Sequence, residues 1–170
     1  QVADAGMQQR SFAALSVNTS NPTFTSGSAF TVPENGVAVT TVAATDADIP
    51  SQPLTYSIIG GADAAFFSVN PSTGELVFNA TPDYEILTDA GLDHTYNITL
   101  QVSDGVTPVT QDVAVTVTSA NDNNPIITSS NAISVSENTT AVTTVTAADA
   151  DIPSQLLTYS IVGGADAARL

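Results

Sequence analysis

The sequence predicts an all-β protein built from β-sandwich repeats in tandem. Three observations indicate this class: apolar and polar residues alternate with a period of two, turn residues separate the short alternating runs, and one long unit occurs more than once. The sequence shows no run with the 3.6-residue period of an amphipathic helix. A sheet-based core is therefore expected throughout the chain.

The repeat is visible as segments that recur at one fixed offset. Residues 46–52 (DADIPSQ) recur unchanged as residues 149–155, and residues 54–58 (LTYSI) recur as residues 157–161. Both copies lie 103 positions downstream (149 minus 46, and 157 minus 54). A unit of about 100 residues has the size of an independent domain. We expect the tail of a preceding repeat in residues 1–20, a complete repeat in residues 21–123, and the first strands of a following, incomplete repeat in residues 124–170.

The first half of the complete repeat contains three predicted strands. Residues 29–32 precede a proline, and residues 37–44 (VAVTTVAA) are rich in β-branched side chains. Residues 54–59 (LTYSII) alternate in polarity, and Gly60-Gly61 ends the run.

The second half of the complete repeat contains four more predicted strands. Residues 66–69 and 75–78 flank a tight turn at residues 72–74 (STG), which predicts a hairpin. Residues 96–102 and 113–117 show the most regular alternation of the chain. Seven strands in about 100 residues indicate an immunoglobulin-like, seven-stranded Greek-key β-sandwich.

The chain is strongly acidic. It has 17 Asp and Glu residues against two Lys and Arg, a formal net charge of -15, and no cysteine. Such a surface repels nucleic-acid phosphates and anionic membranes, and no apolar run approaches the roughly 20 residues of a membrane span. We expect no nucleic-acid partner, no membrane insertion and no disulfide framework.

The acidic residues fall in short motifs along the complete repeat. In order along the chain the motifs are residues 33–35 (PEN), 46–48 (DAD), 83–85 (DYE), 103–105 (SDG) and 121–125 (NDNNP). This order resembles a cadherin repeat, specifically the cadherin-like repeats of bacterial surface and secreted proteins. The resemblance implies an extracellular or cell-surface location, calcium ions as the cofactor, and neighbouring repeats as partners. Identical chains are a further expected partner, because the open strand edges of the incomplete repeat favour pairing.

Calcium suits the acidic motifs chemically. It takes six to eight oxygen ligands in irregular geometry, and clustered carboxylates repel each other strongly without a cation. Side chains two residues apart on a strand share a face, so each acid pair is expected to aim two carboxylates at one ion. These pairs are Asp46 with Asp48, Asp83 with Glu85, and Asp149 with Asp151.

The resemblance assigns ligands at two junctions. At the junction between the complete and the following repeat they are Glu34, Asp83, Glu85, Asn121, Asp122, Asn123, Asp149 and Asp151. At the preceding junction, Asp46, Asp48 and Asp104 face residues 18–22 (NTSNP), where Thr19 stands in place of the acid. We expect one weakly held ion there, or none.

No enzyme is predicted. Asp83 and Glu85 are too close in sequence to flank a glycosidic bond from two sides, and the sequence has no nucleophile elbow or phosphate loop.

The leading hypothesis is a calcium-rigidified structural and adhesion repeat of a bacterial surface or secreted protein. Two alternatives stay open: a calcium-dependent polysaccharide-binding module, and a filament subunit that assembles head-to-tail by strand sharing.

Overall fold

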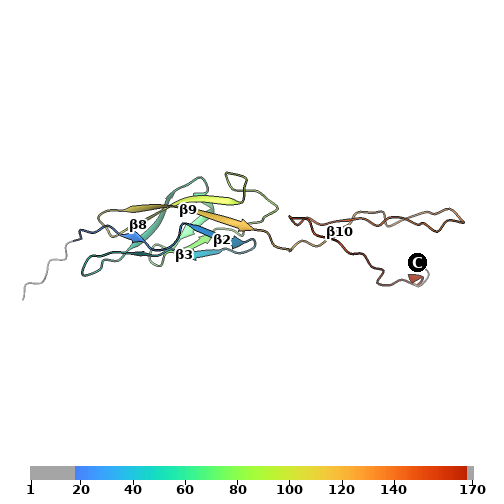
Figure 1. Ribbon diagram of the computed structural model, residues 1–170, viewed down its shortest axis with the longest axis horizontal. Helices are drawn as coiled ribbons and strands as arrows, with labels where there is room; N and C mark the ends of the chain where they lie inside the picture. The colour runs from blue at the N-terminus through green and yellow to red at the C-terminus, as the bar shows by residue number, and fades with distance from the viewer. Residues whose placement is uncertain (1–17, 168–170) are drawn as a thin grey trace, which may run out of the picture.

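Two β-sheets form a sandwich toward the amino-terminal end of the structure, a computed structural model that describes residues 18–167 (Figure 1). The larger sheet has the strand order β2-β9-β8-β5, in which β2 is parallel to β9 and the other neighbours are antiparallel. Its strands are β2 (Ala29–Pro33), β5 (Thr55–Gly60), β8 (Thr95–Ser103) and β9 (Val109–Thr118).

The smaller sheet has three antiparallel strands in the order β3-β7-β6. They are β3 (Ala38–Thr41), β6 (Phe67–Val69) and β7 (Glu75–Phe78). A 3-10 turn, η1 (Ala64–Phe66), precedes β6. The predicted all-β sandwich is confirmed, and none of the helices among the described residues is long and apolar enough to cross a membrane.

One predicted strand was wrong in its extent. The run 37–44 is divided into β3 and a short strand β4 (Ala44–Thr45), which pairs with β1 (Thr23–Phe24) instead of with the smaller sheet. Val42 separates the two: its side chain is buried, and its N–H donates to the Gly74 carbonyl at 2.8 Å. The chain changes hydrogen-bonding partner at this point, and sequence alternation alone does not reveal such a change.

The core lies between the sheets and follows the period of two in the longest strands. Alternate residues of β8 and β9 are buried, which gives each strand one inward face. Phe67 and Phe78 from the smaller sheet lie with their ring centroids 4.3 Å apart, and Tyr96 from β8 meets Phe78 edge-on at 5.2 Å. This aromatic group joins the two layers.

The described part of the following repeat forms only one short ribbon. Strand β10 (Ile126–Ile127) pairs with β11 (Ala147–Ala148), in the same register as β1 with β4. Residues 157–161 have the same sequence as residues 54–58, yet no strand forms there. Residues 55–60 pair with β8, whereas the copy of this segment pairs with no strand among the described residues. Of the first strands expected in this segment, the described residues form only β10 and β11, because a strand needs a pairing partner.

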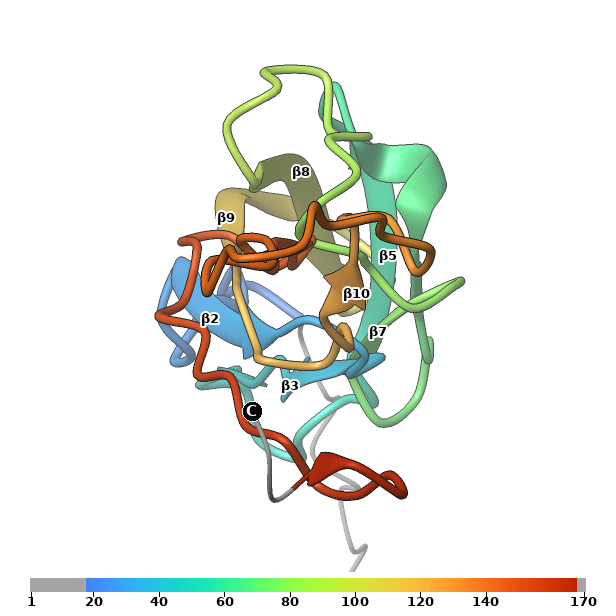
Figure 2. The same ribbon diagram turned by 90° about the vertical axis from the view of Figure 1, so that its right-hand side faces the viewer.

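The described residues extend beyond the sandwich at one end. Residues 126–167 run away from it along the long axis, and an end-on view shows them in front of the two sheets (Figures 1 and 2). The predicted tail of a preceding repeat falls mainly on residues 1–17, which lie outside the described residues.

Two fully buried aspartates brace the long loop before β8. The Asp63 carboxylate accepts hydrogen bonds from the Ala90 N–H at 2.7 Å and the Asn97 N–H at 2.8 Å. The Asp89 carboxylate accepts from the N–H groups of Asp93 at 2.9 Å and His94 at 3.2 Å. Burial would raise the pKa of the Asp89 carboxyl, but these hydrogen bonds outweigh it and hold the pKa below 3.8.

We predict that Gly61→Ala destabilises the sandwich by about 3 kcal/mol. Gly61 has φ of 103°, and an added Cβ would overlap the backbone of Ile98 and the Asn97 carbonyl. Gly164→Ala is the matched control: it occupies the equivalent position with φ of 123°, but no atom lies within 4 Å of its added Cβ. Urea denaturation of both variants measures the difference, and equal losses of stability would contradict the assigned packing.

We predict that Asp89→Asn lowers the free energy of unfolding by about 1–3 kcal/mol near neutral pH, because a buried charged acceptor is lost. The folded-state pKa is lowered, so the wild-type advantage is present above pH 3.8 and disappears as the pH falls through the folded-state pKa. Denaturation of both proteins at a series of pH values in EDTA measures the difference. Glu75→Gln, at an exposed position of β7, is the control and should change little. A difference that persists unchanged in strong acid would contradict the assignment.

Candidate metal centres at the two ends of the sandwich

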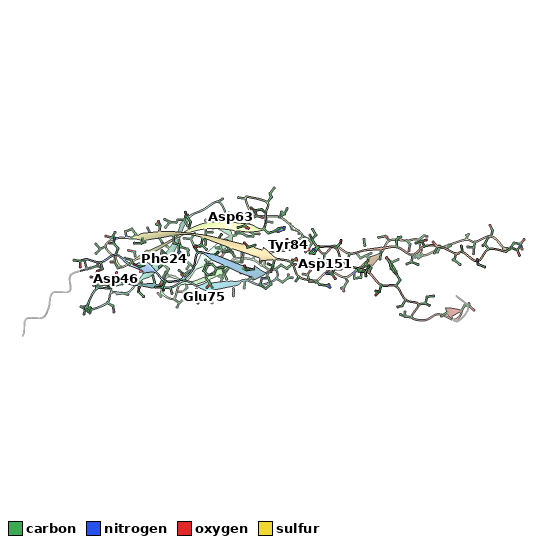
Figure 3. All side chains as sticks on the ribbon, viewed as in Figure 1. Phe24, Asp46, Asp63, Glu75, Tyr84 and Asp151 are labelled. Atoms are coloured by element: carbon green, nitrogen blue, oxygen red, sulfur yellow. The ribbon has the colours of Figure 1, made fainter. Side chains whose placement is uncertain are left out.

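Acidic side chains gather at both ends of the sandwich. Figure 3 shows Asp46 at one end, and Tyr84 and Asp151 at the other. Three sets of acids bring one carboxylate oxygen from each member within 4.8 Å of the others. The sets are Glu34 with Asp83 and Glu85; Glu85 with Asp122 and Asp151; and Asp46 with Asp48 and Asp104. Glu85 belongs to two of them.

Glu34 lies immediately after β2 and is 4% exposed. Its own N–H donates to the Thr118 carbonyl at 2.9 Å, which extends the pairing of β2 with β9. Its carboxylate accepts one hydrogen bond from the Tyr84 N–H at 2.7 Å and another from the Ala120 N–H. Glu34 thus connects the loop that carries Asp83 and Glu85 to the start of the linker.

The three acid pairs are assembled by turns, not by strands. In each pair the N–H of the second acid donates to Oδ1 of the first, at 2.8 Å for Asp48, 3.0 Å for Glu85 and 3.0 Å for Asp151. This is an Asx turn, which an aspartate side chain makes with the backbone two residues later. Asp46 with Asp48 and Asp83 with Glu85 each fall in one acidic set, whereas Asp149 belongs to none. The predicted cause of the pairing, a shared strand face, was wrong because all three pairs lie outside the strands.

The Tyr84 side chain supports the same loop. Its ring stacks on the imidazole of His94, with the ring centroids 3.7 Å apart and an interplanar angle of 8°. His94 has φ of 63° and lies just before β8. The stack therefore connects the loop that carries Asp83 and Glu85 to the start of β8 in the larger sheet.

The linker is fastened to the following repeat by Asp151, which is 2% exposed. Asp151 Oδ1 accepts hydrogen bonds from the N–H groups of Asp122 at 3.4 Å and Asn123 at 3.0 Å, and from the Asn123 side-chain amide at 3.0 Å. Burial would raise the pKa of the Asp151 carboxyl, but the hydrogen bonds from Asn123 and Asp122 hold it below its ordinary value. The group is therefore anionic at neutral pH.

A hydrogen bond also joins the loop that carries Asp83 and Glu85 directly to the following repeat. The Ile152 N–H donates to Glu85 Oε1 at 3.0 Å. Glu85 therefore touches the downstream repeat while it also belongs to both acidic sets at this junction.

Three of the predicted ligands lie at the junction but outside the acidic sets. Asp149 Oδ1 accepts the Asp151 N–H, and the Asn123 amide donates to Asp122 as well as to Asp151. The Asn121 amide donates to the Gln155 side-chain oxygen. Ligation by Asp149, Asn121 and Asn123 stays a prediction.

The acidic set at the other end lies within one repeat. Asp48 accepts hydrogen bonds from the N–H groups of Thr19 at 2.9 Å and Ser20 at 3.1 Å, which parallels the contact of Asp151 with the second linker. Burial would raise the pKa of the Asp48 carboxyl, but these bonds hold it below its ordinary value. The Val106 N–H, at 2.9 Å from Oδ1, lowers the pKa of Asp104 in the same way.

Two carboxylate oxygens of this set have no hydrogen-bond partner among the described residues. They are Asp46 Oδ2 and Asp104 Oδ2, both buried, and Asp104 is only 7% exposed overall. A buried carboxylate oxygen without a partner carries a large desolvation cost, which a bound cation would remove. The donor set consists only of oxygen atoms, as a hard cation such as calcium requires, so the residues fit that ion.

Sequence reasoning missed two residues at the junction. The Asn35 amide donates to Asp122 Oδ2, and the Gln155 amide donates to Asp151 Oδ2 at 3.1 Å. Both residues are in motifs that recur at the 103-residue offset (138 minus 35, and 155 minus 52). The exact recurrence of these motifs could have indicated that Asn35 and Gln155 have a role at the junction. The sequence prediction assigned a role only to the acids of the same motifs.

Comparison with known proteins supports one family. The family model described as "Cadherin domain" matches residues 28–118. Human Protocadherin Fat 1 is 38% identical over 138 residues, which cover 76% of this chain and 3% of that protein. Human Cadherin-related family member 2 is 37% identical over 120 residues, or 67% of this chain and 8% of that protein. The chain thus spans a small fraction of the length of these relatives.

Solved structures show the same likeness. A crystal structure of human Protocadherin-24 EC1-2 is similar with a TM-score of 0.61 and 30% sequence identity, over 80% of this chain and 62% of that chain. The human Desmocollin-1 ectodomain is similar with a TM-score of 0.54 and 27% identity, over 81% of this chain and 28% of that chain. The sandwich, the order of the acidic motifs and the matched family model together show that this chain belongs to the cadherin family.

Proposed function

We propose that this chain is a calcium-binding structural and adhesion repeat in which calcium holds consecutive repeats in line. One observation carries the proposal: Glu85, Asp122 and Asp151 come from the complete repeat, the linker and the following repeat, and their carboxylate oxygens lie within 4.8 Å of one another. A cation bound there would contact all three segments at once. An ion that binds only the aligned arrangement stabilises that arrangement by its binding free energy.

The family supports the general class. Cadherins are calcium-dependent adhesion proteins and not enzymes, and their domains are extracellular or on the cell surface. The proposal for this chain takes residues 21–123 as the complete repeat, residues 1–20 as the tail of its predecessor and residues 124–170 as the start of its successor. Neighbouring repeats or identical chains are the proposed partners.

The two ends of the sandwich offer different numbers of carboxylates for the proposed calcium ions. Glu34, Asp83 and Glu85 would hold one ion beside the second set of Glu85, Asp122 and Asp151. At the opposite end Asp46, Asp48 and Asp104 would hold an ion without any acid from residues 18–22, because Thr19 stands where the second linker has Asp122. Fewer carboxylates bind calcium more weakly. The proposal therefore assigns the tighter binding to the junction around Asp122.

The finer hypotheses about the parent protein stay predictions. These are a role on a bacterial surface, calcium-dependent binding of a polysaccharide, and head-to-tail assembly by strand sharing. Large apolar side chains in residues 126–162 are exposed, Leu156 at 94% and Val162 at 97% among them. Exposed apolar side chains of this kind favour association, and concentration-dependent light scattering tests whether an identical chain covers them.

We predict that calcium raises the stability of the 170-residue chain by about 2–3 kcal/mol at 100 times its dissociation constant, and that EDTA abolishes the increase. Asp122→Ala should reduce the calcium-dependent part and leave the stability in EDTA nearly unchanged, because Asp122 is exposed. Thermal unfolding with and without calcium measures both effects. Asp112→Ala, at an exposed position of β9, is the control. A melting curve of the wild type that calcium does not shift would refute the proposal.

We predict that Glu34→Ala lowers stability by about 1–3 kcal/mol even in EDTA, because the partly buried N–H groups of Tyr84 and Ala120 lose their acceptor. It should also reduce the stabilisation by calcium. Glu137→Ala is the matched control, since Glu137 is the exposed equivalent in the following repeat. Urea denaturation in EDTA and in calcium separates the two roles. If Glu34→Ala changed only the calcium-dependent part, Glu34 would be a ligand without the structural role described above.

A further inference from the structure

The junction contains a neutral side chain that contacts the linker acid directly. Asn35 follows Glu34, and its side-chain amide donates a hydrogen bond to Asp122 Oδ2 across 87 positions of sequence. The Asn35 N–H donates to the Pro82 carbonyl at 3.0 Å, beside the loop that carries Asp83 and Glu85. Asn35 therefore touches the linker and the upstream acidic loop at the same time.

The backbone at Asn35 is in the left-handed region, with φ of 65°. Asparagine and glycine adopt this conformation more readily than other residues. This backbone directs the side chain toward the linker while the preceding residue, Glu34, remains buried. Glycine would adopt this backbone conformation equally well. Glycine, however, has no side-chain amide that could donate a hydrogen bond to Asp122.

The contact matters because Asp122 has few other constraints. Its side chain is exposed, and among the described residues its Oδ1 accepts a hydrogen bond only from the amide of the adjacent Asn123, at 3.0 Å. Its neighbours in the acidic set, Glu85 and Asp151, are both carboxylates and repel it. Without a donor from the upstream repeat, the Asp122 side chain would turn away from them into solvent.

We propose that Asn35 is a positioning residue that holds the Asp122 carboxylate toward Glu85 and Asp151 before calcium arrives. The amide suits this role because it donates a hydrogen bond without adding a positive charge. A lysine or arginine at this position would neutralise Asp122 and compete with the ion. This inference rests on the proposed function of the junction but concerns a residue outside the acidic sets.

The chain supplies its own control for the backbone. Asn138 is the equivalent of Asn35 in the following repeat (138 minus 35 is 103) and has φ of 64°. The outgoing linker of that repeat is not among the 170 residues of the chain. Asn138→Gly therefore makes the same change of backbone and side chain where no linker acid can be lost.

We expect Asn35→Gly to lower calcium affinity about fivefold, as the loss of one hydrogen bond to a carboxylate implies, whereas Asn138→Gly leaves it unchanged. Isothermal titration with calcium chloride measures these affinities in the full 170-residue chain. Wild-type affinity in Asn35→Gly, or an equal loss in Asn138→Gly, would overturn the proposal.

A second measurement tests the contact without calcium. In EDTA, Asn35→Gly should accelerate hydrogen exchange at the linker amides 121–123, while the amides of β8 and β9 exchange as in the wild type. Unchanged exchange at the linker would overturn the positioning role. If the wild type bound no calcium at all, the proposed function would fail, but faster linker exchange in Asn35→Gly would still establish the contact with Asp122.

Discussion

The junction depends on the buried carboxylate of Glu34. It accepts hydrogen bonds from the backbone of Tyr84 and Ala120, two segments that no strand pairing brings together. The same residue extends the pairing of β2 with β9 through its own N–H. A charged acceptor inside the protein is stable only when such donors surround it. The acidic loop and the linker are therefore held in place by the protein itself, and an ion would bind an arrangement that already exists.

The positions of the acids could be predicted from the sequence, but the way they are held could not. Asp46 with Asp48 and Asp149 with Asp151 were recognised because whole motifs recur. The hydrogen bond within each pair is an Asx turn, which depends on backbone angles that polarity patterns do not encode. The role of Asn35 could not be predicted for a related reason. Its side chain is neutral, so it does not stand out among the acidic residues, and its hydrogen-bond partner Asp122 is 87 positions away in the sequence.

Identical sequences in this chain adopt different structures in different surroundings. Residues 54–58 contribute to β5, whereas the same five residues at 157–161 form no strand. The division of residues 37–44 at Val42 has the same origin, because β3 pairs with β7 while β4 pairs with β1. β-strand propensity mainly reflects packing and pairing with neighbours, so a strand could be predicted only where its partner was also present.

The position of Glu85 between two acidic sets affects how the junction responds to calcium. It belongs to two acidic sets and accepts the Ile152 N–H of the following repeat. Two ions that share one carboxylate cannot bind independently, because each ion orients a ligand of the other. With calcium bound as proposed, the occupancy of both positions and the orientation of the second repeat would form one coupled equilibrium. The junction would then respond to calcium concentration as a unit, not as the sum of separate sites.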